Sequence, residues 1–330
     1  MHALAQQGIS PFGVYVTSPD YLGGMQDIPA LAAVCRAQGV PLLVDNAHGA
    51  YLRFLPQNCH PIAQGAAMCC DSAHKTLPAV TGGAYLHLAH DAPVQDEAAV
   101  RGALALFGST SPSYLILQSL DACNAVLAGD YPQRLSQCCA ALEGLRRSLN
   151  KVAAARQCPV PLAVFTYYIA GIAVAQQEPM KLTLDAAALG CTGMALAEAL
   201  RRAQLECEYA DPRYVVLMFT PENPPQDFER LQRALEQLLA AVPAGLPRPE
   251  NRAGEFAALQ QQAVQRCTIR QAVLGAQVRV PVHKALGRVC AMPTVSCPPA
   301  IPVAVSGEEI TPAAIALMQH YGIEEISVLR

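Results

Sequence analysis

The stretch DSAHKTLP at residues 71–78 directly follows the apolar segment 66–70, and the stretch DNAHGA at residues 45–50 directly follows the apolar segment 40–44. Both apolar segments are short and uncharged, as buried strands are. Each polar stretch therefore stands at the carboxyl end of an expected strand. Because ligands of parallel α/β sheets bind beyond the carboxyl ends of the strands, we expect Asp45 and Lys75 to lie at one binding edge.

Strand-like and helix-like segments alternate around these two stretches. We expect strands at residues 13–16, 40–44, 66–70 and 83–88, and helices at 28–38 and 56–65. Near-continuous apolar strands separated by helices are typical of a sheet that is covered on both faces and is largely parallel. The sequence therefore predicts an α/β fold.

The later sequence predicts a second α/β unit. Helices are expected at 114–127, 131–152, 192–204 and 226–241, and strands at 181–184 and 214–220. The apolar part of the stretch 157–177 is shorter than the roughly 20 residues of a membrane-spanning helix, so we expect buried strands around Gly171. We divide the chain into domains at residues 1–130, 131–245 and 246–330, with prolines marking the last boundary.

Composition points to small-molecule partners. The formal net charge is −3 and only 15% of the residues are charged, so no basic surface for nucleic acid is expected. The 13 cysteines form no CxxC pair, and we expect reduced thiols, no metal site and a cytoplasmic location. The first residues lack the charged and apolar regions of a signal peptide.

The Ser-x-His-Lys motif that ends at Lys75, together with the Asp-x-Ala-His motif that begins at Asp45, resembles the Orn/Lys/Arg decarboxylase family of fold-type-I enzymes. Two further segments are similar to this family. They are FGSTSPSYL at residues 107–115 and CPPAIPVAVSGE at 297–308, in which Ala300 and Ser306 stand where the family usually has Gly and Pro. The resemblance implies a fold-type-I large domain, present in part, a smaller α/β domain and a C-terminal decarboxylase-type domain.

Enzymes of this family use pyridoxal 5'-phosphate (PLP), so the resemblance implies roles for individual residues. Lys75 would carry the cofactor as a Schiff base, and burial would favour the neutral amine that this chemistry needs. Asp45 would face the pyridinium nitrogen, although a carboxylate at this position could also cap the following turn. Ala47 would pack against one face of the ring.

The remaining candidate residues would contact the phosphate or the reacting region. The resemblance implies that Ser72 and His74 lie there, whereas His48 could equally be a turn residue. Ser109 and Thr110 would reach the cofactor phosphate of the neighbouring subunit in a homodimer or larger homo-oligomer, or would serve as a helix N-cap. We assign catalytic roles to Lys75, Asp45, His48 and His74.

Three functions remain open at this point. The first is a PLP-dependent decarboxylase that converts arginine, lysine or ornithine to a polyamine-type amine. The others are another fold-type-I enzyme, such as an aminotransferase or aldolase-like lyase, and a non-catalytic relative that binds a full-length partner. Glu206, Glu208 and Asp211 could recognise a basic side chain, but solvated strand-end charge is the simpler interpretation.

Family members begin with roughly another third of the large domain, which holds a phosphate-binding loop and a side chain that stacks on the cofactor ring. No such loop precedes Asp45 in these 330 residues. A phosphate dianion needs several converging N–H donors. We therefore expect that the 330-residue chain by itself is not a competent decarboxylase.

Overall fold

The computed structural model describes residues 4, 6–109, 111–164, 168–169, 172–173, 176–243, 245–247, 259, 262–292, 294–297 and 301–330. The chain forms two compact units. The first comprises residues 1–146, 175–182 and 218–230, and the second comprises residues 147–174, 183–217 and 231–330. No helix in the described ranges is both long enough and apolar enough to span a bilayer.

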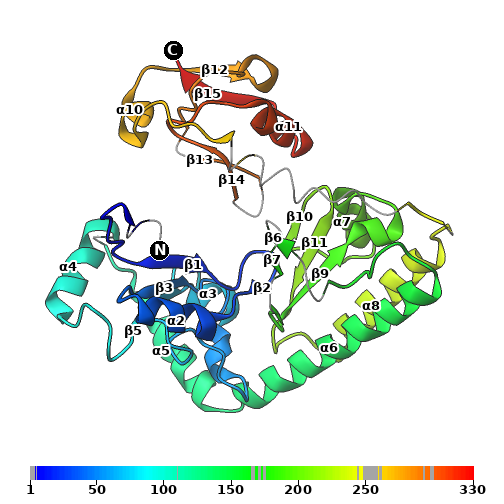
Figure 1. Cartoon of the computed structure of the whole chain (residues 1–330). Helices are drawn as coiled ribbons and strands as arrows, with labels where there is room; N and C mark the ends of the chain where they lie inside the picture. Colours follow the sequence, from blue (N-terminus) through cyan, green and yellow to red (C-terminus); the bar gives the residue numbers. More distant parts are fainter. Residues whose placement is uncertain are drawn as a thin grey trace. The chain divides into compact units, whose positions relative to one another are not determined.

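The first unit contains a four-stranded sheet in the order β1-β3-β4-β5 (Figure 1). The parallel strands are β1 (Val14–Thr17), β3 (Leu42–Asp45) and β4 (Met68–Asp71), and β5 (Tyr85–Leu88) pairs antiparallel with β4. The expected strands and the largely parallel arrangement are confirmed. Asp45 lies opposite Cys70 in the register, so β3 and β4 end at the same edge.

Helix α2 (Ile28–Ala37) covers one face of this sheet. The Asp27 side chain caps its first turn by accepting a hydrogen bond from the Ala30 N–H, and Gly39, at φ +66°, follows its end. Its buried residues pack against apolar side chains of β3 and β4 in one core; the members are Ile28, Ala32, Cys35, Leu42, Val44, Ala66 and Cys69. Burial of this face holds the helix on the sheet.

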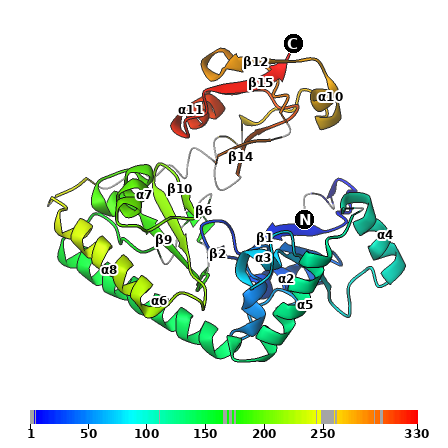
Figure 2. The ribbon, with the colours of Figure 1, turned by 180° about the vertical axis from the view of Figure 1, so that it is seen from behind.

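The first unit contains further short strands and helices. They are β2 (Gly24–Met25), which pairs with β8 (Gln176–Gln177), the 3-10 helix η1 (Ala50–Phe54), and helices α3 (Ala73–Thr76), α4 (Glu97–Phe107) and α5 (Tyr114–Ala128). Figure 2 shows α5 leading into the long helix α6 (Tyr131–Ala155). A second core joins η1, α3, α5 and α6, with Tyr51, Tyr131 and Leu135 fully buried.

One local prediction in this unit is wrong, and one helix was not predicted. The helix expected at 56–65 is wrong, because these residues form bends and turns around two prolines, Pro56 and Pro61. Helix α4 was not predicted; none of its residues is buried, so it lacks the one-sided burial on which periodicity depends.

A three-stranded sheet, in the order β10-β11-β9, belongs mainly to the second unit. Its strands are β9 (Lys181–Asp185), β10 (Tyr209–Ala210) and β11 (Tyr214–Met218), and β10 and β11 are antiparallel. The associated helices are η2 (Ala186–Leu189), α7 (Gly193–Arg202) and α8 (Pro225–Ala240), which runs beside α6 in both views (Figures 1 and 2). The backbone near Gly171 forms a small hairpin of β6 (Tyr168–Ile169) and β7 (Ile172–Ala173), and Gly171 itself lies outside the described residues.

Residues 259–330 have a core of their own, in which twelve of the described residues are buried, including Ile310, Met318 and Val328. Their helices are α10 (Ile269–Leu274), η3 (Val282–Lys284) and α11 (Pro312–His320), and their strands are β12 (Gln277–Pro281), β13 (Thr294–Cys297), β14 (Ile301–Val305) and β15 (Glu325–Leu329). β12 pairs with β15, and β13 pairs with β14, both antiparallel. Ala300 lies outside the described residues, and Ser306 donates a hydrogen bond to the Met292 carbonyl.

Candidate active site

The structure brings the two motif segments together at the carboxyl edge of the sheet. Asp45 is the last residue of β3, and the single-turn helix α3 follows directly after β4. Backbone hydrogen bonds continue the pairing past the strand ends, since the Asn46 N–H donates to the Cys70 carbonyl over 2.9 Å. Residues thirty positions apart thus share one edge because parallel strands align their carboxyl ends.

Lys75 contacts His48 at this edge. The distance between Lys75 Nζ and His48 Nε2 is 3.3 Å, within hydrogen-bond range. The expectation that Lys75 is buried is wrong. Ala73 and Thr76 are the buried residues of α3, whereas Lys75 lies exposed on the outer face of this helix. The amine is therefore accessible to a ligand.

His48 is neutral in this environment. Its side chain is buried, and burial together with the nearby ammonium groups of Lys181 and Lys75 lowers its pKa to about 3. A neutral imidazole with its lone pair on Nε2 can accept a hydrogen bond from the Lys75 ammonium. Its other nitrogen, Nδ1, is buried and has no hydrogen-bond partner among the residues described, while the ring contacts Tyr21 edge-on at 5.2 Å between centroids.

Lys181 completes the polar surroundings of His48, although the sequence placed it only on an expected strand. It is fully buried, and its Nζ donates to the Asp20 carbonyl over 3.1 Å and lies 5.7 Å from the centre of the Tyr21 ring. Burial of Glu178 raises the pKa of this carboxyl, and the positive charge of Lys181 acts in the opposite direction. A lysine in an apolar strand is a weak signal, because its partners at residues 20 and 21 are distant in the sequence.

The Asp45 carboxylate accepts hydrogen bonds from the Tyr15 hydroxyl and the Ala47 N–H, and a weaker one from the Cys70 thiol at 3.9 Å. Its Oδ2 accepts from the Tyr15 hydroxyl over 3.1 Å, and its Oδ1 accepts from the Ala47 N–H over 3.1 Å. The second bond is the turn-capping role considered from the sequence, so this role is present. Burial and the Asp45 charge raise the pKa of Tyr15 to about 12, which keeps its hydroxyl protonated as a donor.

The candidate phosphate contacts are distributed between α3 and the loop before α5. Ser72 is the half-buried N-cap residue of α3, and its hydroxyl makes no capping bond. His74 Nδ1 donates to the Gly83 carbonyl over 2.8 Å, so neutral His74 offers only an acceptor at Nε2. A phosphate contact from His74 would therefore require its protonated form.

The second candidate loop is bonded locally. Among the described contacts, the Ser109 hydroxyl accepts from the Ser111 N–H over 3.1 Å and donates to the Ser111 carbonyl. The N-cap of α5 is Ser113, without a side-chain capping bond, so the helix-cap interpretation does not apply to Ser109. Thr110 lies outside the described residues.

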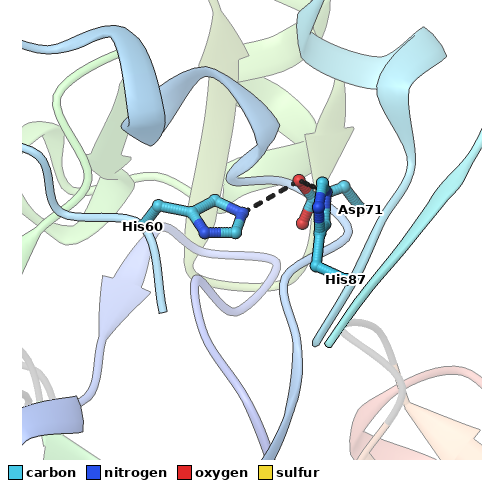
Figure 3. Close-up of side chains that lie close together, drawn as sticks. All are labelled: His60, Asp71 and His87. Carbon is cyan, nitrogen blue, oxygen red and sulfur yellow. Dashed lines mark hydrogen bonds and ion pairs between the residues drawn. The ribbon is translucent and has the colours of Figure 1, made fainter. Parts of the chain in front are cut away.

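A third group, not predicted from the sequence, consists of His60, Asp71 and His87 (Figure 3). Both imidazole Nε2 atoms lie 3.0 Å from Asp71 Oδ2, and Asp71 and His60 are buried. Asp71 immediately precedes Ser72. The available signal was the placement of polar Asp71 and His87 in otherwise apolar strands, but nothing in the sequence brings His60 to them.

The three candidate acidic groups for a basic substrate have partners in the second unit. Glu206 forms an ion pair with Arg201 over 3.1 Å at an exposed position. Asp211 Oδ1 accepts from the backbone N–H groups of Arg213 and Tyr214, as a turn-capping residue does. These contacts favour a structural role for Glu206 and Asp211, and Glu208 also takes part in interactions within the described protein.

Solved structures show which fold surrounds the site. The E. coli constitutive lysine decarboxylase superposes with a TM-score of 0.70 at 17% identity, covering 97% of this chain and 58% of that one. An alanine–glyoxylate aminotransferase from Nostoc superposes with a TM-score of 0.52 at 16% identity, covering 72% of this chain and 64% of that one. The fold is therefore that of the fold-type-I PLP-dependent enzymes, as expected from the sequence.

Sequence comparison narrows this class to one family. The family model described as "Orn/Lys/Arg decarboxylase, major domain" matches residues 2–226, and the chain belongs to this family. An arginine decarboxylase from Bacillus subtilis is 27% identical over 303 residues, which cover 91% of this chain and 59% of that protein. The chain thus spans about three fifths of the length of this curated relative.

The residues at the edge fit PLP, the cofactor of this family. They supply an accessible amine on Lys75, a carboxylate on Asp45 and a hydroxyl on Ser72, which are the donor and acceptor types that an aldehyde, a pyridinium nitrogen and a phosphate require. His48 contacts the amine through Nε2, and its buried Nδ1 has no hydrogen-bond partner among the described residues. A buried polar group is normally hydrogen-bonded, so this atom has capacity for a ligand.

Proposed function

We propose that this chain carries the lysine-bearing part of a PLP-dependent decarboxylase for a basic amino acid, namely arginine, lysine or ornithine. The observation that carries the proposal is the placement of Asp45 and Lys75 at the ends of adjacent parallel strands, within the region that matches the family model. The named relatives support a basic substrate, since one is an arginine decarboxylase and one a lysine decarboxylase.

Each residue at the edge has a separate task in this proposal. Lys75 would hold the cofactor covalently, Asp45 would keep the pyridine nitrogen protonated, and Ser72 would donate to the phosphate. When bound, PLP supplies the electron sink for the electron pair left on Cα after CO2 departs. Ala47 follows Asp45 by two residues and is half-buried, so a larger side chain there would occupy space beside the carboxylate.

His48 would orient the amine of Lys75 as a hydrogen-bond acceptor. An ammonium group cannot act as a nucleophile, so the amine must transfer a proton before it reacts. His48 Nε2 is within 3.3 Å of Nζ and has a free lone pair because the ring is neutral. A ring with a pKa of about 3 is too weak a base to take a proton from an ammonium group, so His48 would accept a hydrogen bond from Nζ and carry its own hydrogen on Nδ1, while the proton would leave the exposed Lys75 amine for water.

Lys75→Ala provides the test of the proposal. In a form of the protein that decarboxylates a basic amino acid, this variant should lose activity and the cofactor bond that borohydride reduces. Peptide mass spectrometry should locate the reduced pyridoxyl group on Lys75 in the unmodified protein. Its location on Lys181 or Lys284, or persistence of activity in Lys75→Ala, would show that the proposed lysine is wrong.

Product analysis tests the reaction type separately. CO2 and an amine in equal amounts are expected from arginine, lysine or ornithine. A 2-oxo acid product would instead indicate the aminotransferase alternative. Polyamine biosynthesis as the physiological role, and the cytoplasmic location predicted from the cysteine content, remain predictions.

A further inference from the structure

The buried carboxylate of Asp71 receives hydrogen bonds from three different parts of the first unit. His60 Nε2 and His87 Nε2 each lie 3.0 Å from Oδ2 (Figure 3). Asn46 Nδ2 donates to Oδ1 over 2.7 Å. The Cys69 thiol adds a weak donor at 3.8 Å from Oδ1. Only 3% of Asp71 is exposed, so these donors replace the water that the carboxylate loses.

Two imidazoles and a carboxylate are also a common ligand set for divalent metals, so the proton positions have to be considered. His60 Nδ1 faces the Ile62 N–H, from which it accepts a long hydrogen bond of 3.4 Å. A neutral imidazole that accepts at Nδ1 carries its hydrogen on Nε2. His60 therefore donates to Asp71, whereas a metal would need the lone pair of the same Nε2 and would leave two N–H groups facing each other at Nδ1.

The charge state of Asp71 agrees with a hydrogen-bonded carboxylate. Burial by itself raises the pKa of this group, but the hydrogen bonds from His60, His87 and Asn46 outweigh burial and hold the pKa below its ordinary value. Asp71 is thus an anion that accepts from every side. Such charge-assisted bonds are shorter and stronger than neutral ones, and they fix the elements that supply them.

The elements fixed in this way lead directly to the candidate cofactor residues. Asn46 follows Asp45 on β3, and Asp71 precedes Ser72 at the start of the segment that carries Lys75. Asp45 bonds to the Tyr15 hydroxyl and the Ala47 N–H, whereas Asn46 bonds to Asp71, so these adjacent side chains have separate partners. Asn46 is closely packed, because a Cβ at Gly49 would lie within van der Waals overlap of its Oδ1.

We propose that Asp71, held by His60, His87 and Asn46, is a positioning residue that keeps Asp45 and Lys75 in a geometry ready to receive PLP. The proposal rests on the proposed function, since it concerns the same cofactor. Asp71, His60, His87 and Asn46 would form a polar clamp that contacts neither the cofactor nor the substrate. The clamp joins β3, β4, β5 and the turn before β4 through one carboxylate.

The experiment compares Asp71→Asn with Asp91→Asn, which alters an exposed aspartate of the same unit. His60→Gln keeps an N–H donor, His60→Ala removes it, and His90→Gln is the exposed histidine control. PLP affinity is measured by absorbance titration of the 330-residue chain, and borohydride trapping followed by mass spectrometry measures attachment to Lys75. Hydrogen exchange of residues 45–49 and 72–76 is measured without PLP, at a temperature where every variant retains its circular dichroism spectrum.

Asp71→Asn should weaken PLP binding about tenfold, because the loss of one charge-assisted hydrogen bond typically has an effect of this size. It should also accelerate exchange in both segments, and His60→Gln should restore most of what His60→Ala loses. A merely structural role would lower the melting temperature and leave affinity and local exchange at the values of the controls.

The outcomes separate this proposal from the function on which it rests. If PLP attaches to Lys75 neither in this chain nor in an active form of the protein, the proposed function fails, and the exchange data still decide whether the clamp orders the two segments. Unchanged exchange and unchanged affinity in Asp71→Asn would overturn the clamp. One equivalent of zinc in the chain purified without chelators, and its loss in His60→Gln, would likewise overturn the clamp and identify the group as a metal site.

Discussion

The buried neutral His48 should make the folding stability of the first unit depend on pH in a defined direction. Its pKa is about 3 in the folded protein, whereas the ordinary pKa of a histidine, which applies to the unfolded chain, is 6.5. Between these values the unfolded state binds the proton and the folded state does not. Stability from this group is therefore complete above about pH 6.5 and is lost progressively as the pH falls toward 3.

The magnitude follows from the distance between the unfolded pKa and the working pH. A pH of 5.0 lies 1.5 units below the unfolded pKa of 6.5, so the histidine is protonated in the unfolded chain, whereas His48 in the folded protein is still neutral. At about 1.4 kcal/mol per unit, the penalty at pH 5.0 is about 2 kcal/mol, and it is close to zero at pH 7.5. Removing the imidazole should remove this pH-dependent part.

The assay is urea unfolding of the PLP-free chain, followed by circular dichroism at pH 7.5 and pH 5.0. The sequence contains no tryptophan, so the far-ultraviolet signal is the appropriate probe. Between the two pH values the unmodified chain should lose about 2 kcal/mol more than His48→Gln. His90→Gln, which alters an exposed histidine, should behave like the unmodified chain. Equal losses in the unmodified chain and in His48→Gln would refute the reasoning.

Three further predictions address the cofactor carboxylate, the C-terminal fold and the surface. Asp45→Asn, made in an active form of the protein, should retain PLP binding while turnover falls by orders of magnitude, and near-normal turnover would leave Asp45 as a turn residue only. Gly307→Ala should lower the unfolding free energy by about 2 kcal/mol or more, because φ is +94° and a Cβ would overlap the Cys267 carbonyl. Gly322 has a φ of +69° and lies in open space, so Gly322→Ala should lower the unfolding free energy by only about 1 kcal/mol. Urea unfolding of both variants compares the two values. The 330-residue chain expressed alone should self-associate without decarboxylating basic amino acids, because Leu106, Phe107 and Tyr114 are at least 78% exposed, and Phe107→Ser should reduce the association seen by analytical ultracentrifugation. CO2 release at a rate typical of enzymes would contradict this last prediction.

Local sequence patterns were enough to predict the sheet and the position of the candidate site along the chain. Short apolar segments predicted β1, β3, β4 and β5, and the polar stretches that begin at Asp45 and Asp71 marked the carboxyl ends of β3 and β4. These inferences succeed because burial selects apolar residues locally and because neighbouring parallel strands end at one edge. The family resemblance then assigned chemistry to Lys75 and Asp45.

The side chains that meet at that edge could be identified only from the folded chain. The contact between Lys75 and His48, the burial of Lys181 against the Asp20 carbonyl, and the convergence of His60 and His87 on Asp71 join residues from separate elements. No local pattern encodes such contacts, because they depend on strand order, register and the path of turns. The exposure of Lys75 has the same origin, since the single turn of α3 directs Ala73 inward and leaves Lys75, two residues later, on the outside.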